Sequence, residues 1–177
     1  TWRSQFVTDG TIKREVGALS AAFNHAIKKH KWRIENPCLK AEIPKEPKGR
    51  VRYLTRPEAK RLLQAAELPY LADFIELALN TGCRKGELLN LKWENIDFST
   101  RLIYLDQTKS GDWQTVPINE EARQVLVRRM RLREQICPNS RWVFFHMVPA
   151  LNSKVGDRVK NIRKSFKSAC NRAGIEN

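Results

Sequence analysis

Apolar residues recur every three or four positions in several stretches of the chain. Residues 11–30 are predicted to form a helix whose apolar stripe consists of Ile12, Val16, Leu19, Phe23 and Ile27. Further helices are predicted over residues 70–80 and 85–90, after Asn119, and over residues 157–172. The stripe of the last helix consists of Val159, Ile162, Phe166 and Cys170. The chain is therefore predicted to be mainly helical.

Polar residues and glycine mark the ends of some of these helices. Thr55-Arg56-Pro57-Glu58 is a capping box, in which the side chains of Thr55 and Glu58 each accept a hydrogen bond from the other residue's backbone N–H. This box predicts that a helix begins directly after Thr55. Gly82 follows the predicted helix over residues 70–80, and glycine readily adopts the left-handed conformation that ends a helix.

A switch to β-branched and aromatic residues predicts strands in the middle of the chain. The expected strands are residues 93–98, 101–105 and 114–118, and a polar loop with glycine at 108–112 joins the last two. Residues 142–146 are expected to be a buried strand or apolar segment. The predicted fold class is α+β, mainly α with a small three-stranded antiparallel sheet.

One segment divides the chain. Residues 44–50 hold two prolines and a glycine but no large apolar side chain, which is typical of a linker. The expected division is a helical piece over 1–45, a linker over 46–51 and a second domain over 52–177.

Charge then narrows the classes of partner. The chain carries 33 lysines and arginines against 19 aspartates and glutamates, a net charge of +14. This excess favours a polyanion as partner, with nucleic acid ahead of an acidic membrane surface. No apolar stretch is long enough for a membrane helix and no signal peptide is recognised, so a cytoplasmic location is expected.

Cysteine and histidine spacing argues against a metal centre. The cysteines are far apart without a Cys-x-x-Cys pair, and the three histidines are scattered. Glycine-rich phosphate loops are also missing from the sequence. We therefore expect no metal and no cofactor, and reduced cysteines with a structural role.

The most informative segment surrounds Arg84. A helix is predicted to end at Gly82 and another to begin at Lys85, so Arg84 lies in the turn where the N–H groups of the second helix point outward. Its guanidinium can donate two parallel hydrogen bonds to a phosphate, and Glu87 can hold it from behind. The pattern alone leaves an alternative open, in which Arg84 and Glu87 form a surface ion pair at a helix start.

The string from Thr81 to Asp97, with Thr-Gly-Cys-Arg-Lys-Gly-Glu-Leu-Leu and then Leu-x-Trp-x-x-Ile-Asp, resembles the first arginine box of tyrosine recombinases, the phage integrase family. Residues 54–58 are similar to the opening of that family's catalytic domain, and residues 107–111 resemble its lysine-bearing β-hairpin. The helix that ends near Asn36-Pro37 is similar to the last part of the family's core-binding domain. The resemblance covers nearly the whole chain.

This resemblance implies roles for individual residues. Arg84 matches the first catalytic arginine, Lys109 matches the hairpin lysine that protonates the leaving 5′-oxygen, and Glu87 matches a supporting acid. Double-stranded DNA is the implied partner, and the complete protein is expected to form dimers or tetramers on it. The residues expected to contact DNA are Lys28, Lys29, Lys31, Arg33, Lys85 and Lys164.

The family's remaining active-site residues, a His-x-x-Arg box and the nucleophilic tyrosine, would follow beyond residue 177. His30-Lys31-Trp32-Arg33 lies before the linker and is interpreted as a chance match. None of Tyr53, Tyr70 and Tyr104 matches the nucleophile, so the chain is expected to be a fragment that is inactive by itself. Two alternatives stay open: a non-catalytic DNA-binding remnant or regulator that occupies recombination sites, and a basic RNA-binding protein.

Overall fold

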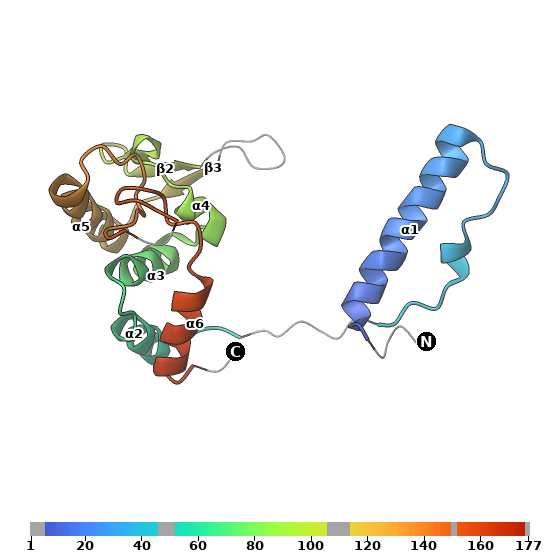
Figure 1. The fold of residues 1–177 in the computed structure, drawn as a ribbon, viewed down its shortest axis with the longest axis horizontal. Coiled ribbons are helices and arrows are strands. Elements are labelled where there is room, and N and C mark those ends of the chain that lie inside the picture. The colour runs from blue at the N-terminus through green and yellow to red at the C-terminus, as the bar shows by residue number, and fades with distance from the viewer. Residues whose placement is uncertain (1–5, 46–51, 106–113, 150–151, 176–177) are drawn as a thin grey trace. The chain divides into compact units, whose positions relative to one another are not determined.

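The computed structural model describes residues 6–45, 52–105, 114–149 and 152–175. The chain forms two compact units, Thr1–Tyr53 and Leu54–Asn177, referred to below as unit 1 and unit 2 (Figure 1). The expected hairpin loop at 108–112, with Lys109, lies outside the described residues.

Unit 1 is built on one long helix, α1 (Asp9–His30), and a short 3-10 helix, η2 (Pro37–Lys40). Asn36 joins them: its buried amide donates to the Ser20 carbonyl and to Asn24 Oδ1 at 3.1 and 3.0 Å, and its Oδ1 accepts from the Cys38 N–H. The predicted helix is confirmed, but its stripe is only partly covered. Ile12 is buried whereas Leu19 is 52% exposed, because the small unit offers little surface to pack against.

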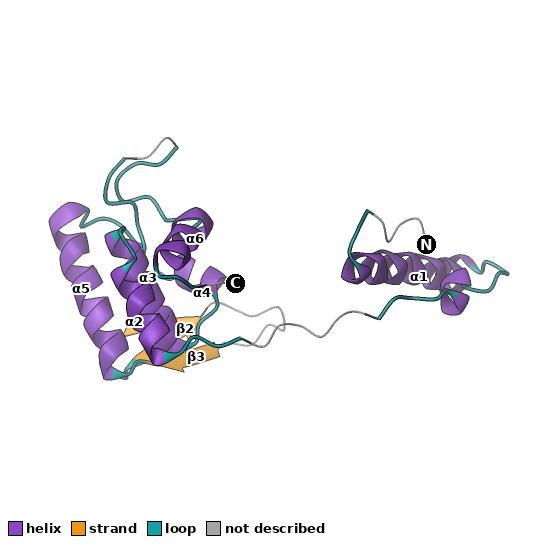
Figure 2. Ribbon diagram, turned by 90° about the horizontal axis from the view of Figure 1, so that it is seen from below, coloured by secondary structure: helices purple, strands orange, loops and turns teal. Residues whose placement is uncertain are grey.

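Unit 2 is mostly helical, and its elements follow each other as the sequence predicts. Its helices are α2 (Arg56–Gln64), α3 (Pro69–Thr81), α4 (Lys85–Leu89), α5 (Glu120–Ile136) and α6 (Arg163–Arg172). The Thr55–Glu58 capping box is present in full. Asn119 caps α5 by accepting from the Ala122 N–H at 2.8 Å. The helices form the bulk of the unit, and the strands form a minor part (Figure 2).

The sheet has three antiparallel strands in the order β1 (Ile96–Asp97), β2 (Leu102–Leu105) and β3 (Gln114–Pro117). Ile103 pairs with both Ile96 and Val116, and it is fully buried. The predicted fold class, mainly α with a small three-stranded antiparallel sheet, is confirmed.

The first strand is shorter than predicted. Trp93–Asn95 forms a 3-10 helix, η3, so the expectation of a strand over 93–98 is wrong for its first half. The aromatic residue of this stretch serves packing, since Trp93 packs against the core and its indole N–H donates to the Trp142 carbonyl at 3.1 Å.

The last helix begins later than predicted, at Arg163 instead of about Asp157. Residues 157–159 are extended alongside residues 144–146, with the Val159 N–H donating to the Phe144 carbonyl at 3.0 Å. Val159 and Ile162 are buried as expected. However, Val159 lies in this extended stretch and Ile162 at its junction with α6, so neither is buried as part of the predicted helix. Phe166 is 36% exposed, so it does not belong to the buried stripe.

The segment over 142–146 is apolar and buried, but it is no strand of the sheet. Val143, Phe144 and Phe145 are each at most 1% exposed. Isolated β-bridges join Trp142 to Lys92 and Phe145 to Arg158. The segment thus connects the region after α4 to the chain that leads into α6.

An arginine is buried in the core between α3 and α5. Arg129 has no exposed side-chain surface, and its Nε and Nη2 donate to the Val143 carbonyl at 3.1 and 3.0 Å. Its guanidinium lies 5.0 Å from the ring centroid of Phe145, and its Nη1 is 3.8 Å from Asp73 Oδ2. Burial lowers the pKa of Arg129 and raises that of Asp73. Arg128 donates to the same carboxylate at 2.8 Å, so Asp73 has a second cationic partner.

Helices α2 and α6 hold each other through two arginines, and they lie side by side in Figure 1. Arg61 of α2 donates to the Ala173 carbonyl after α6 at 3.1 Å. Arg172 of α6 donates from Nε and Nη2 to the Ala65 carbonyl after α2, at 3.1 and 2.8 Å. Each guanidinium therefore satisfies a carbonyl at the C-terminal end of the other helix, where a cation is favoured.

Asp97 is expected to make the turn between β1 and β2 sensitive to acid. Its Oδ1 accepts from the Ser99 hydroxyl at 2.6 Å and from the Ser99 and Thr100 N–H groups at 2.8 and 3.2 Å. These bonds lower the pKa of the Asp97 carboxyl from 3.8 to about 2. Because the folded-state pKa is below the unfolded value, ionised Asp97 stabilises the fold fully above the unfolded pKa, and this contribution is lost as the pH falls through the folded one.

Urea midpoints of the wild type and of Asp97→Asn measure this contribution. We expect the variant to unfold at lower urea at pH 6, and the gap to narrow below about pH 4 as Asp97 of the wild type becomes protonated and, like the asparagine of the variant at every pH, neutral. Glu134→Gln, on the exposed surface of α5, is the control and should leave the midpoint unchanged. A gap for Asp97→Asn that is the same at every pH at which the fold is retained would contradict the assignment.

Candidate nucleic-acid site

Arg84 lies in the short turn between two helices. Helix α3 ends at Thr81, and Gly82 follows in the left-handed conformation with φ 66°. Arg84 is the N-cap of α4, with extended backbone angles (φ −65°, ψ 149°). Glycine accepts the positive φ without the steric cost that a side chain would bring, so the turn places Arg84 at the surface directly after a core helix.

Glu87 orients Arg84 at two atoms. Its Oε2 accepts from the Arg84 backbone N–H and its Oε1 from Arg84 Nη1, both at 2.7 Å. Burial by itself would raise the pKa of Glu87, but the hydrogen bonds and charge of Arg84 outweigh it and lower that pKa. The same bond and charge raise the pKa of Arg84. Arg84 is therefore a permanent cation at a fixed place.

The Arg84 guanidinium keeps donors for a ligand. Its side chain is 75% exposed, whereas that of Glu87 is 21% exposed. Within the described residues, this guanidinium donates one hydrogen bond, and Glu87 accepts it. A guanidinium has five N–H donors, so a planar edge stays available for an anion such as a phosphate.

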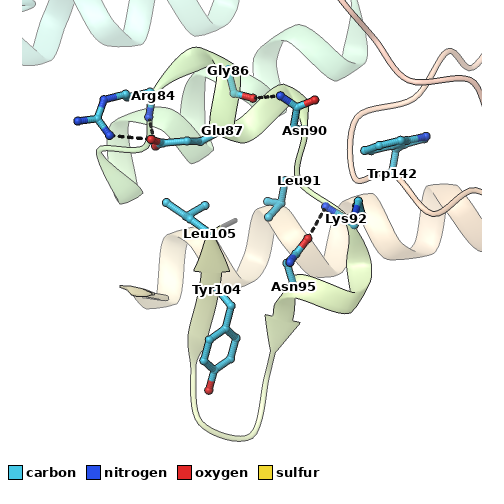
Figure 3. A pocket seen from close by; sticks show the side chains of 10 residues that line it. All are labelled: Arg84, Gly86, Glu87, Asn90, Leu91, Lys92, Asn95, Tyr104, Leu105 and Trp142. Carbon is cyan, nitrogen blue, oxygen red and sulfur yellow. Dashed lines mark hydrogen bonds and ion pairs between the residues drawn. The ribbon is translucent and has the colours of Figure 1, made fainter. Parts of the chain in front are cut away.

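Arg84 and Glu87 line a cavity of about 580 Å³, which we call the Arg84 cavity (Figure 3). Its walls come from α4, from the chain that follows it, from β2 and from the 142–146 segment. Besides Arg84 and Glu87, it is lined by Gly86, Asn90, Leu91, Lys92, Asn95, Tyr104, Leu105 and Trp142. Figure 3 shows Arg84 and Trp142 at opposite ends of the drawn residues.

Sequence reasoning missed the polar and aromatic residues on the far side of this cavity. The Lys92 N–H donates to Asn95 Oδ1 at 3.3 Å, and Lys92 Nζ is 3.2 Å from Glu94 Oε1. Trp142 reaches the cavity through its bridge to Lys92. Lys92 and Asn95 lie close to Arg84 in the chain, which is a signal that could have identified them. No local sequence pattern predicts the pairing of Trp142 with Lys92.

The remaining predicted contact residues are exposed. Lys85 is the first residue of α4, and Lys164 lies in the first turn of α6. In unit 1, Lys28 and Lys29 lie in the last turn of α1, and Lys31 and Arg33 follow the helix. The structure brings Arg84, Glu87 and Lys85 together.

The described ranges hold no group of three or more His, Cys, Asp or Glu side chains placed to bind a metal ion. None of their helices is both long and apolar enough to cross a membrane.

A sequence model of the phage integrase family matches residues 52–177, which is more than half of the chain. The chain belongs to the phage integrase family. The match includes the whole Arg84 cavity. The family resemblance seen in the residues around Arg84 is thereby confirmed.

Curated relatives agree with this family. The integrase of Salmonella phage P22 is 29% identical over 154 residues, covering 82% of this chain and 38% of that protein. The shufflon-specific DNA recombinase of Escherichia coli is 36% identical over 124 residues, covering 68% of this chain and 32% of that protein. The chain thus spans 32–38% of the length of these relatives.

Solved structures share the fold. The Tn1549 transposon integrase, solved with circular intermediate DNA, aligns with a TM-score of 0.72 at 22% identity and covers 97% of this chain and 60% of that chain. The XerA recombinase aligns with a TM-score of 0.59 at 25% identity and covers 89% of this chain and 54% of that chain. Both solved proteins therefore share this fold.

Proposed function

We propose that the complete protein to which this chain belongs is a site-specific DNA recombinase. It cleaves and rejoins DNA strands through a 3′-phosphotyrosine, without a metal or other cofactor. The observation that carries the proposal is the Arg84–Glu87 pair in its cavity, inside the part of the chain that matches the phage integrase family.

Arg84 supports the chemistry by neutralising charge. Attack on a phosphodiester places extra negative charge on the non-bridging oxygens, and a fixed guanidinium aimed at them lowers the barrier. Glu87 keeps the guanidinium in place. Lys109, outside the described residues, is proposed as the general acid that gives a proton to the leaving 5′-oxygen.

The tyrosines of this chain do not supply the nucleophile in this proposal. Burial raises the pKa of Tyr70, which disfavours the phenolate. Tyr104 lines the Arg84 cavity, but its hydroxyl points away from Arg84 (Figure 3). By itself the chain is therefore proposed to bind DNA without cutting it, which is also how the alternative of a remnant or regulator would behave.

The remaining parts receive roles in the same scheme. Residues 1–45 are proposed as the end of a helical core-binding domain, 46–51 as a linker and 52–177 as the first part of the catalytic domain. Double-stranded DNA is the proposed partner, with self-association of the complete protein on it. The proposed backbone contacts are Lys28, Lys29, Lys31, Arg33, Lys85 and Lys164, and the proposed location is the cytoplasm.

Duplex binding at rising salt tests the proposal. We expect the logarithm of the binding constant to fall linearly with the logarithm of salt concentration, by about 0.9 for every phosphate neutralised, because phosphate contacts release counterions. Affinity that ignores salt would contradict DNA binding. Duplex RNA serves as competitor, and stronger binding of RNA than of DNA would favour the RNA-binding alternative. In the complete protein, a covalent protein–DNA adduct should form on a cleavable duplex.

A further inference from the structure

Trp142 lines two cavities of unit 2. One is the Arg84 cavity, and the other has a volume of about 420 Å³ and is also lined by Ser153, Asp157, Arg158 and Lys160. We call the second one the Arg158 cavity. The same indole ring is therefore a wall shared by the proposed catalytic cavity and a neighbouring one.

The position of Trp142 is fixed by backbone pairing on both sides. The Trp93 N–H donates to the Arg141 carbonyl and the Val143 N–H to the Leu91 carbonyl, both at 3.0 Å. The Trp93 indole N–H donates to the carbonyl of Trp142 itself at 3.1 Å. These hydrogen bonds attach Trp142 to the chain after α4, the helix that Arg84 caps. The attachment is centred three residues beyond the end of α4.

Two arginines hold the indole ring. The guanidinium carbon of Arg141 lies 5.5 Å and that of Arg158 5.2 Å from its centroid. Cations near an aromatic face are attracted to it, which keeps both guanidinium groups at the ring. Arg141 is also 3.6 Å from Glu94, so its charge is partly compensated.

Arg158 and Lys160 have no such compensation in the described part of the chain, where no carboxylate lies within ion-pair distance of either. Asp157 is the acid of the Arg158 cavity, and its Oδ2 accepts from the Lys154 N–H at 2.7 Å. The backbone around Arg158 is held to the 144–146 segment by its bridge to Phe145. The cavity thus offers two cations on a fixed backbone, with the Ser153 hydroxyl as a further donor.

We propose that the Arg158 cavity binds a second backbone phosphate of the DNA that Arg84 contacts, with Trp142 as the wall between the two phosphate sites. The proposal rests on the DNA-binding function proposed above. Arg158 and Lys160 supply the charge, and the arginine-held ring sets the spacing between the sites. These residues bind and position the strand, and they take no part in the chemistry.

The salt dependence of duplex binding by this chain tests the proposal with Arg158→Gln and Lys160→Gln. Each variant should weaken binding about tenfold at ~50 mM salt. Each should also reduce the slope of log K against log salt by about 0.9, because one phosphate contact is lost. A purely structural role would not change this slope. Lys160 is exposed, so Lys160→Gln keeps the test valid if Arg158→Gln fails to fold.

Arg131→Gln is the matched control, since it removes one exposed positive charge from α5, beside a different cavity. We expect its slope to equal that of the wild type. Slopes for both test variants equal to wild type, or equally reduced in the control, would overturn the proposal. A wild-type chain whose affinity ignores salt would instead contradict the proposed function itself, so the two failures are distinct.

Discussion

Replacing Arg84 with alanine is expected to slow DNA cleavage by the proposed recombinase about 10²–10³-fold while most of its DNA affinity remains. The guanidinium is exposed and oriented by Glu87, so in the proposed mechanism it faces the charge that develops on the phosphate during attack. Losing one such preorganised donor group costs about 10²–10³ in rate. Binding is spread over many cations and falls far less. The measurements are the rate of covalent adduct formation on a cleavable duplex and, separately, the binding constant.

The chain offers a close control for this experiment. Arg123 and Glu120 form an ion pair with the same i,i+3 spacing, at 3.0 Å, on α5. Arg123→Ala removes an equal charge from an equal kind of pair, and we expect it to leave the cleavage rate unchanged. Arg84→Lys keeps the charge but loses the planar donor edge, so it should stay well below wild type. Cleavage by Arg84→Ala at the wild-type rate would remove Arg84 from the mechanism.

The largest effect on stability is expected at Arg129. Replacement by alanine leaves the Val143 carbonyl without its two donors, removes a cationic partner of Asp73 and opens a cavity beside Phe144 and Phe145. Asp73 keeps Arg128 as a partner, so we expect the unsatisfied carbonyl, the cavity and the lost charge contact together to cost about 3–5 kcal/mol. That is a large part of the ~5–15 kcal/mol that stabilises an ordinary domain. Urea unfolding at low temperature, followed by circular dichroism, measures the loss.

Two further variants show which interactions account for the stability lost in Arg129→Ala. Arg131→Ala, two residues on and exposed on the same helix, should stay within about 0.5 kcal/mol of wild type. Arg129→Met restores much of the volume without the donors, so its stability should lie between wild type and Arg129→Ala. If Arg129→Ala were as stable as Arg131→Ala, the buried arginine would have no part in holding α3 to α5.

The sequence predicted best where a local interaction decides the structure. The Thr55–Glu58 box and the Gly82 cap need only residues within one turn, and both are present as expected. The Arg84–Glu87 pair belongs to the same kind, because three residues separate its members at a helix start. Such interactions are encoded by spacing, so a single sequence reveals them.

Prediction failed where distant segments compete with a local pattern. Val159 and Ile162 stand three residues apart and suggest a helix, but the pairing of residues 157–159 with 144–146 keeps that stretch extended. Trp142 faces Lys92 through a similar long-range bridge. Burial of Arg129 also depends on a distant acid, Asp73, and on a carbonyl 14 residues away. None of these partners can be chosen from the sequence alone.

The hydrogen bonds of Arg61 and Arg172 that join α2 to α6 imply an order in which parts of the chain fold during synthesis. In unit 1, Asn36 finds Ser20 and Asn24 only 16 and 12 residues behind it. In unit 2, the carbonyl of Ala173 to which Arg61 donates within the described residues is made 112 residues later. At about 5–20 residues per second, this interval lasts roughly 6 to 22 s. Unit 1 can therefore fold early, while the rest of the chain is still being synthesised. Helix α2, in contrast, has no α6 to pack against until nearly all of unit 2 has been made.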